Sequence, residues 1–487
     1  MKRKKSPHPQ WAVQYRKPGT ELRLVNGKYY LYDVSSKWNP DKKRAQKITG
    51  KILGKITEDR GFVPSEKRGL MEKAAKGIDV KNVSVKEYGV TRYLLQEGSA
   101  ITKSLESVFP EYGKLIFAAA FLRLLHQSQI KNMGIYANES FIGEYVGKRI
   151  DDKLISTMLR TIGSNRQPLV EYMRGFMSEK DQVLIDMTHM ITYSQKMLSP
   201  KNGYKKVMDY RPQVNLLYIY SSSHKSPTFY RLVPGNIKEV KAFTLSLKES
   251  GLTDVMVIAD KGFYSGNNIE QLRGEKLQYI IPLRRSSSLI DYSKAGQSNK
   301  NEMSGFFKFE KRYIWYCSYE KSGEKIVTFL DERLKIEEEY DYLKRIDDKK
   351  KGYTLDGFRQ KQHVFGTLTM VYETNGDERG IYYAYKSRAN IEVMFDAGKN
   401  ILEMDCTYMQ NEHSLEGWMF VHHIALQLYY ILYRKLVETD LITKYSVTDL
   451  LLFLSLIRKV KINNNWFPAE ITKPTQNLLD KLNAHIT

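Results

Sequence analysis

The chain reads Val-Leu-Ile-Asp-Met over residues 183–187 and Val-Met-Val-Ile-Ala-Asp over residues 255–260. Short apolar runs of this kind are typical of strands buried in a sheet. Each run contains one aspartate, Asp186 or Asp260, at a position where an unpaired carboxylate would be costly. A third acid, Glu392, lies further along the chain in a helical pattern. Three oxygen ligands that converge on Mg²⁺ would offset the cost, so the pattern predicts a metal site.

The elements around these acids predict the fold. Strand patterns are followed by a helix, a strand that ends at Asp260, a short helix and another strand; the ranges are 183–193, 214–220, 229–233, 237–250, 255–260, 267–272 and 279–283. This element order is that of the ribonuclease-H-like fold. By analogy we predict an α/β protein with a ribonuclease-H-like catalytic core, a β-rich insertion before Glu392, and a small β unit and a helical DNA-binding region before the core.

Changes in pattern along the 487 residues suggest six segments. We predict an N-terminal β-rich basic unit, a helical DNA-end-binding region, the first part of the core, the β-rich insertion, the completion of the core with the glutamate helix, and a C-terminal helical region for oligomerisation. Their ranges are 1–85, 86–180, 181–289, 290–380, 381–437 and 438–487.

The N-terminal segment has a strong hairpin signal, because Asn26-Gly27 separates the strand patterns of residues 22–25 and 28–32. A third strand is expected at 48–53, after a turn at 39–41. Lysines and tyrosines alternate here. They would form either a phosphate-contacting face with stacking aromatic rings or a half-exposed sheet with solvated lysines, and the pattern leaves both open.

In the helical segment, residues 154–162 and 168–176 have the spacing of a helix-turn-helix, with Gly163 as the turn. Arg160, Arg166 and Arg174 would then contact phosphates. The alternative is a helical hairpin that only packs, which is the more common case for any one pair of helices with this spacing.

The net charge of +22 and the pI near 9.5 favour a polyanionic partner, nucleic acid or an anionic membrane surface, over a protein that merely carries solvated lysines. No stretch approaches 18 charge-free apolar residues, and residues 115–125 and 418–433 are typical of buried core helices. The basic N-terminus is followed by Pro7 and Pro9 and is no secretory signal. Cys317 and Cys406 form no metal-binding or disulfide pattern, which fits a reducing cytoplasm.

We expect one helix over residues 381–402. At about 100° per residue, Tyr385, Arg388, Glu392 and Lys399 fall within roughly 60° of one another on one face of that helix. Arg388 could grip a phosphate bidentately, Tyr385 could donate to a phosphate or stack on a base, and Lys399 would add a point charge. The alternative is a solvated face with ion pairing between Arg388 and Glu392. Asp396 is the other candidate for the third acid.

The spacing of Tyr385, Arg388, Glu392 and Lys399 resembles the Tyr-x2-Arg-x3-Glu-x6-Lys signature of DDE transposases from bacterial insertion sequences, in the insertion-sequence-four-like group. Residues 184–188 and 259–265 look like the segments around that family's two aspartates, and the similarity extends through Gly417-Trp418-Met419-Phe420. It covers roughly residues 180–435.

The resemblance implies a two-metal enzyme that uses Mg²⁺, with Mn²⁺ as a substitute, held by Asp186, Asp260 and Glu392. It implies cleavage at the terminal inverted repeats of the element, joining of the 3′ ends to target DNA, and a homodimer on double-stranded DNA in the bacterial cytoplasm, in association with the nucleoid. In many relatives the signature tyrosine and arginine handle a hairpin intermediate, and a tryptophan of the insertion stacks on a flipped base; Trp315 is the tryptophan available here, unless it is a core residue. The other readings are a nuclease on the same core and an inactive DNA-binding relic.

Overall fold

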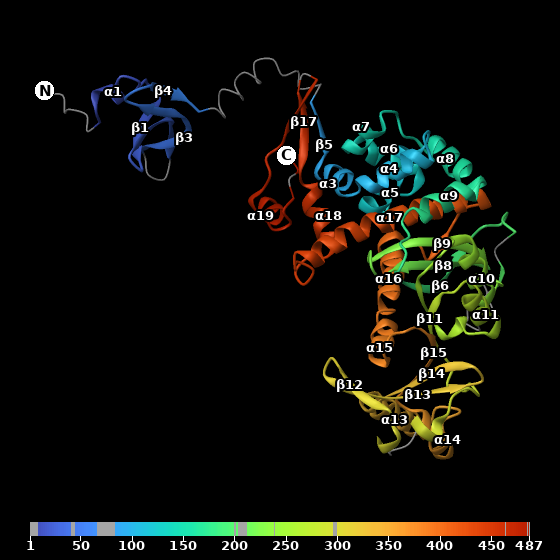
Figure 1. Ribbon diagram of the computed structural model, residues 1–487. Coiled ribbons are helices and arrows are strands. Elements are labelled where there is room, and N and C mark those ends of the chain that lie inside the picture. Colours follow the sequence, from blue (N-terminus) through green and yellow to red (C-terminus); the bar gives the residue numbers. More distant parts are fainter. Residues whose placement is uncertain are drawn as a thin grey trace, which may run out of the picture. The chain divides into compact units, whose positions relative to one another are not determined.

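The computed structural model describes residues 8–39, 44–65, 83–198, 201–202, 212–237, 239–295, 300–462, 464–484 and 486. These residues form two compact units (Figure 1). The first comprises Met1–Val85 and Lys459–Ala469, and the second comprises Lys86–Arg458 and Glu470–Thr487.

The first unit contains an antiparallel four-stranded sheet in the order β1-β2-β3-β4, with a short helix before it. The bounds are α1 Gln10–Val13, β1 Thr20–Val25, β2 Lys28–Asn39, β3 Arg44–Thr57 and β4 Gly61–Pro64. The predicted hairpin is confirmed, and Asn26 and Gly27 both have positive φ, 50° and 74°. The predicted third strand is longer than expected, and most of the turn before it lies outside the described residues.

We expected a helical C-terminal segment, but the structure shows that it is only partly helical. It contains the hairpin of β17 (Arg458–Ile462) and β18 (Asn465–Pro468) as well as α18 (Val447–Ser455) and α19 (Lys473–Lys481). The two strands form a three-stranded sheet with β5 (Ser84–Glu87), in the order β18-β17-β5.

The second unit begins with consecutive helices and ends its core with one long helix. The bounds are α3 Gly89–Glu97, α4 Ser99–Val108, α5 Gly113–His126, α6 Ile130–Asn138, α7 Phe141–Val146, α8 Asp152–Ser164, α9 Arg166–Arg174 and α17 Glu412–Glu438. Helix α17 contacts α5 and α8 on one side and the sheet on the other, so it lies between these two layers (Figure 1). Both stretches predicted as core helices, within α5 and α17, are buried. In the part of the chain that the structure describes, no helix is long and apolar enough to span a membrane.

The predicted helix-turn-helix is wrong at its turn. Gly163 lies inside α8, and the chain turns at Asn165, whose side chain accepts a hydrogen bond from the Gln167 amide and caps α9. A Cβ on Gly163 would lie 1.9 Å from the carbonyl oxygen of His413 in α17. The glycine is therefore required for close packing of two helices, which is the alternative that the sequence left open.

The matching glycine on the other helix supplies a test of this packing. A Cβ on Gly417 would lie 2.2 Å from the carbonyl oxygen of Leu159, so Gly417→Ala must push α8 and α17 apart. We expect a loss of at least about 2 kcal/mol in the free energy of unfolding, measured by urea denaturation. The control is Gly266→Ala in α11 (Gly266–Gly274), where the new Cβ meets nothing within 4 Å. Equal stability of the two variants would contradict the close packing.

The large sheet of the second unit has eleven strands, nine of them in the order β12-β13-β14-β15-β11-β10-β6-β8-β7, with β9 paired to β8 and β16 to β6. The predicted core strands and helices are all present: β6 Gln182–Thr192, β8 Pro212–Ser221, β9 Ser226–Pro234, α10 Glu239–Ser250, β10 Met256–Ala259, α11, and β11 Gln278–Pro282. The two remaining short strands are β7 Lys201–Asn202 and β16 Cys406–Thr407. Strands β6, β10 and β11 are parallel, and β8 runs antiparallel to β6.

The region predicted as a separate insertion is instead continuous with this sheet, because β15 pairs antiparallel with β11. Strands β12 and β13 of this region form a hairpin that turns at Glu310, where φ is 52°. The bounds are α12 Tyr292–Ala295, β12 Gly305–Phe309, β13 Arg312–Lys321, β14 Glu324–Asp331, α13 Glu332–Asp347, α14 Leu355–Lys361 and β15 Thr367–Glu373. Trp315 is only partly buried, and its ring packs against Phe306 and beneath the Lys300 ammonium.

Candidate active site

Two of the three acids lie side by side at the centre of the large sheet. Strands β6 and β10 are parallel neighbours, and Ile185 is the register partner of Ala259. Asp186 directly follows Ile185, and Asp260 directly follows Ala259. The two aspartates therefore lie at the same height along the neighbouring strands. Asp186 lies within β6, whereas Asp260 follows β10 and begins the short 3-10 helix Lys261–Phe263.

The helix expected over residues 381–402 is interrupted. The structure has α15 (Glu378–Lys386) and α16 (Ala389–Leu402), with Ser387 and Arg388 between them. The assumption of a single straight face was therefore wrong, and Tyr385 belongs to a different helix from Glu392 and Lys399. The break places Arg388 at the N-cap of α16, immediately before the turn that carries Glu392.

Packing on both sides fixes the position of this break. In α16, Ile391 and Met394 are fully buried, and the Phe395 ring packs edge-on against Tyr218, the register partner of Asp186 on β8. In α15, Tyr382 packs against three phenylalanines, Phe307, Phe309 and Phe329. One helix is thus docked on the core strands and the other on the strands of the insertion, and Arg388 lies at their junction.

The Arg388 guanidinium contacts all three acids. Its Nη1 is 3.3 Å from Asp186 Oδ2 and 3.6 Å from Asp260 Oδ1, and its Nη2 donates a hydrogen bond to Glu392 Oε1. The helical pairing with Glu392 could be read from the spacing, but the contacts with the two aspartates depend on the tertiary fold. Three carboxylates from β6, the end of β10 and α16 therefore surround one cation.

The acids are less buried than the apolar runs suggested. The exposed fractions of their side chains are 20% for Asp186, 32% for Asp260 and 59% for Glu392, whereas that of Arg388 is 15%. The carboxylates can thus be reached from solvent. A large charged substrate could approach them without unfolding of the core.

The environment also sets the protonation of the two signature donors. Burial raises the pKa of the Tyr385 phenol, with a contribution from Asp260 and Glu392, while Arg388 opposes it. Burial acts to lower the pKa of the Arg388 guanidinium, but Asp186, Asp260 and the other neighbouring groups outweigh it, and the net change is a rise. Near neutral pH, Tyr385 remains a hydrogen-bond donor and Arg388 remains a cation.

The chemistry of the three acids fits a hard divalent cation, because such ions prefer carboxylate oxygens. Among the described residues, no three His, Cys, Asp or Glu side chains are arranged to hold a metal ion. The Arg388 guanidinium supplies the positive charge at the centre of the group. A metal ion at this position would therefore require Arg388 to move away from the carboxylates.

The remaining predicted residues lie outside this cluster. Lys399 is partly buried near the C-terminal end of α16, and no ion pair joins it to the three acids among the described residues. Asp396, the alternative third acid, is exposed and accepts a hydrogen bond of 2.6 Å from Asn400 Nδ2. The structure therefore brings Glu392, and not Asp396, to the two aspartates.

Two of the arginines assigned to phosphate contacts have partners within the protein. Arg166 donates to Glu249, Glu416 and the carbonyl oxygen of Tyr230, and Arg174 donates to the carbonyl oxygen of Glu249 at the end of α10. Basic side chains in a helical hairpin gave no signal that would separate internal pairing from DNA contact, because their partners are distant in sequence.

The chain was compared with family models, curated proteins and solved structures. A family model described as "Transposase DDE domain" matches residues 177–428, a segment that contains Asp186, Asp260 and Glu392. No curated protein matches the chain. Among solved structures, the chain is similar to the piggyBac transposase in a cryo-EM structure of its synaptic complex with hairpin DNA, with 10% sequence identity, a TM-score of 0.41 and coverage of 70% of each chain.

The family match spans more than half of the 487 residues and includes the whole cluster of acids around Arg388. The chain therefore belongs to the transposase DDE domain family, whose members act in DNA transposition and recombination.

Proposed function

We propose that this protein is a cut-and-paste transposase of the insertion-sequence-four-like group. It would bind the terminal inverted repeats of an insertion sequence, cleave the DNA ends and join the 3′ ends to target DNA. The observation that carries this proposal is the convergence of Asp186, Asp260 and Glu392 on one guanidinium, from three elements that are far apart in the sequence.

The strand arrangement supports a ribonuclease-H-like core. The order β9-β8-β6-β10-β11, with β8 antiparallel and β6, β10 and β11 parallel, places the two aspartates on adjacent central strands. The end of a central parallel strand is a common position for catalytic groups in α/β sheets. The glutamate helix then packs against β6 and completes the group of acids.

Asp186, Asp260 and Glu392 would hold two Mg²⁺ ions, or Mn²⁺ in their place, and bound ions would activate the attacking water or 3′-hydroxyl and stabilise the leaving oxygen. Arg388, released from the carboxylates, can hold a phosphate with two parallel hydrogen bonds. Tyr385 remains protonated and can donate to a neighbouring phosphate oxygen. Lys399 would contact the DNA backbone further along α16. No side-chain nucleophile is needed, because the 3′-hydroxyl of DNA serves.

The proposed partners are the terminal repeats and target DNA, bound by a homodimer in the bacterial cytoplasm, in association with the nucleoid. The net charge of +22 supports a DNA partner, because cationic surfaces release counterions from the phosphate backbone when they bind.

The position of Arg388 predicts competition with metal ions. Arg388→Ala removes the cation that the three carboxylates now surround, so DNA-free protein should bind Mn²⁺ about tenfold more tightly, since one competing charge is lost. Electron paramagnetic resonance of free Mn²⁺ during a titration measures this affinity without any catalytic step. The same variant should process DNA ends more slowly, because it lacks the phosphate clamp.

The control is Lys399→Ala, which removes one positive charge from the same helix without touching the acids. Its Mn²⁺ affinity should equal that of the wild type. Unchanged or weaker Mn²⁺ binding by Arg388→Ala would show that the guanidinium does not occupy the ion position.

One reaction tests the function itself. Wild type and Glu392→Gln are incubated with Mg²⁺, the terminal repeats that flank the coding sequence and a supercoiled target, and excised and joined products are scored separately. Joined product that depends on Glu392 supports the transposase. Excision without joining would favour a nuclease on the same core, and tight end binding without any chemistry would favour a DNA-binding relic.

A further inference from the structure

Part of the first unit is a two-stranded ribbon that extends beyond its sheet. Strand β2 pairs with β1 only up to Asp33, and β3 pairs with β4 only from Gly54 onwards. Between these limits, residues 34–39 of β2 and 44–49 of β3 pair with each other alone. At about 3.3 Å per residue, the ribbon extends roughly 20 Å beyond the four-stranded part of the sheet.

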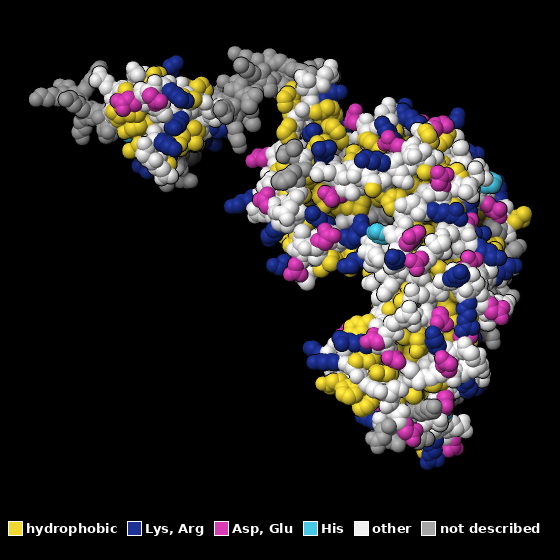
Figure 2. Space-filling model, viewed as in Figure 1, with side chains coloured by type: hydrophobic (Ala, Val, Ile, Leu, Met, Phe, Trp, Pro, Cys, Tyr) yellow, Lys and Arg dark blue, Asp and Glu magenta, His cyan; other side chains and the backbone are white. Residues whose placement is uncertain are grey.

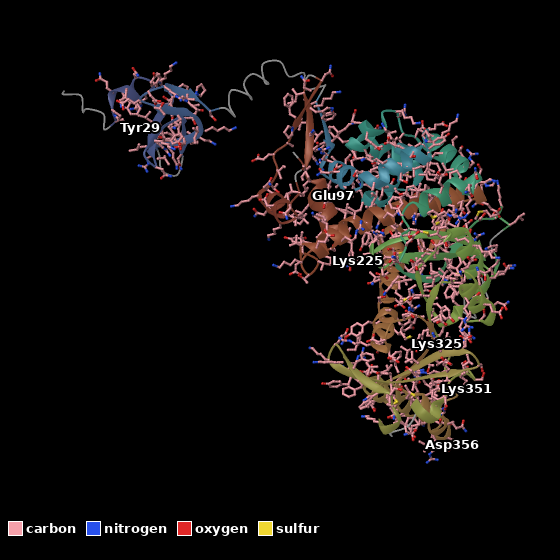
Figure 3. All side chains as sticks on the ribbon, viewed as in Figure 1. Tyr29, Glu97, Lys225, Lys325, Lys351 and Asp356 are labelled. Carbon is pink, nitrogen blue, oxygen red and sulfur yellow. The ribbon has the colours of Figure 1, made fainter. Side chains whose placement is uncertain are left out.

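The ribbon is exposed on both faces. Every residue from Arg44 to Ile52 is exposed, and so are those of β2 from Ser35 to Trp38, including the Trp38 ring at 62%. The small core of this unit lies elsewhere, around Leu22, Leu31 and Ile56. Tyr29, which Figure 3 labels, packs against that core, and its ring lies edge-on to Trp11.

The charge of the ribbon is of one sign. Its described residues include Lys37, Arg44, Lys47 and, at its base, Lys51, without an aspartate or glutamate between Val34 and Leu53 in the part that the structure describes. Lys and Arg side chains are also frequent on the visible face of this unit (Figure 2). An isolated two-stranded ribbon is marginally stable in water, so contact with a partner would stabilise it.

The base of the ribbon is held by polar contacts. The Lys47 ammonium lies 2.6 Å from Glu21 Oε1 on β1, and Arg23 Nη2 donates to Thr49 Oγ1 at 2.6 Å. Arg23 also pairs with Glu21. These contacts join β1 to the part of β3 that leaves the sheet, so they would limit bending of the ribbon.

One face of the ribbon has residue types that recognise DNA bases. Lys37 is opposite Gln46, and Asn39 is opposite Arg44, so these four side chains lie on the same face. Asn39 Nδ2 donates to Gln46 Oε1 at 3.0 Å. Arginine and lysine recognise guanine, and asparagine and glutamine recognise adenine, at their major-groove edges. We call Lys37, Asn39, Arg44 and Gln46 the reading face.

We propose that the β2–β3 ribbon enters the major groove of the terminal-repeat DNA and directs its reading face towards the base edges. This inference rests on the proposed function and names the part of the chain that recognises the DNA end. Two strands lie about 5 Å apart and the groove is about 12 Å wide, so a ribbon with its side chains fits. The charge of the ribbon complements DNA and opposes pairing with a second copy of the same cationic ribbon.

The test compares two full-length double variants that lose the same charge. Lys37→Gln with Arg44→Gln changes the reading face, and Lys28→Gln with Arg60→Gln changes exposed residues at the opposite end of the sheet. Binding to a terminal-repeat duplex and to a random duplex is measured by fluorescence anisotropy. Methylation protection reports contacts with guanine N7 in the major groove, and thermal unfolding verifies that each variant folds.

The reading-face variant should bind the terminal repeat about tenfold or more weakly, with a much smaller loss on the random duplex, and should lose protection at specific guanines. The control variant should retain both. Equal losses on the two duplexes, or protection identical to wild type, would overturn the proposal. So would a reading-face variant that loses only self-association in sedimentation. DNA cleavage by the wild-type protein in the same preparation tests the proposed function separately from the ribbon. If the wild type cleaves DNA and the reading-face variant gives the wild-type footprint, the ribbon proposal fails and the transposase proposal stands.

Discussion

Asp260→Asn should reduce DNA end cleavage by about a thousandfold or more. The substitution keeps the shape of the side chain but removes the carboxylate charge beside Arg388. Ligation of catalytic ions contributes several kcal/mol to transition-state stabilisation, and about 4 kcal/mol corresponds to a thousandfold in rate. Asp186→Asn and Glu392→Gln should behave alike. Binding of the DNA end should change little, because cationic surfaces supply most of it. Single-turnover cleavage and anisotropy measure the two effects.

Asp396→Asn is the matched control for the acid variants. Asp396 is one turn beyond Glu392 on α16, but it is exposed and bonds to Asn400. Its replacement should leave the cleavage rate within about twofold of wild type. If Glu392→Gln cleaved DNA at the wild-type rate and Asp396→Asn did not cleave it, Asp396 would be the third catalytic acid.

Arg166→Ala should strongly destabilise the second unit. The Arg166 guanidinium donates to Glu249 at 2.9 Å and to Glu416 at 2.5 Å, and both carboxylates are largely buried. Removal of one partner leaves buried charges without compensation, which costs about 3 kcal/mol or more. Arg231 remains beside Glu249 at 2.8 Å and limits the loss there, so Glu416 bears most of it. Urea denaturation measures the change in the free energy of unfolding.

Arg333→Ala is the control for this stability effect. Arg333 pairs with Glu337 one turn away on α13, and both side chains are more than half exposed. Its removal should cost no more than about 0.5 kcal/mol, because solvent screens exposed pairs. If Arg166→Ala were equally mild while its DNA affinity fell, the arginine would be a phosphate contact, as the helix-turn-helix reading supposed.

The prediction of the core strands succeeded because their signal is local. Residues 183–187 lie in β6 and residues 256–259 form β10, both with largely buried apolar side chains, and an apolar run of that length has few other stable environments. The Asn26-Gly27 turn was predictable for the same reason, since both residues tolerate positive φ. Gly163 shows the converse. A glycine between two helical patterns indicates a turn by sequence alone, yet here its missing side chain lets α17 approach α8.

The sequence by itself determined the order of the elements, the identity of the candidate acids and the cationic character of the chain, because periodicity, spacing and charge are properties of neighbouring residues. Only the tertiary structure decided that the glutamate helix breaks before Arg388, that the insertion continues the core sheet through β15, and that one guanidinium meets all three acids. These features depend on packing between residues as far apart as Asp186 and Arg388, and such contacts leave no periodic signal in either segment.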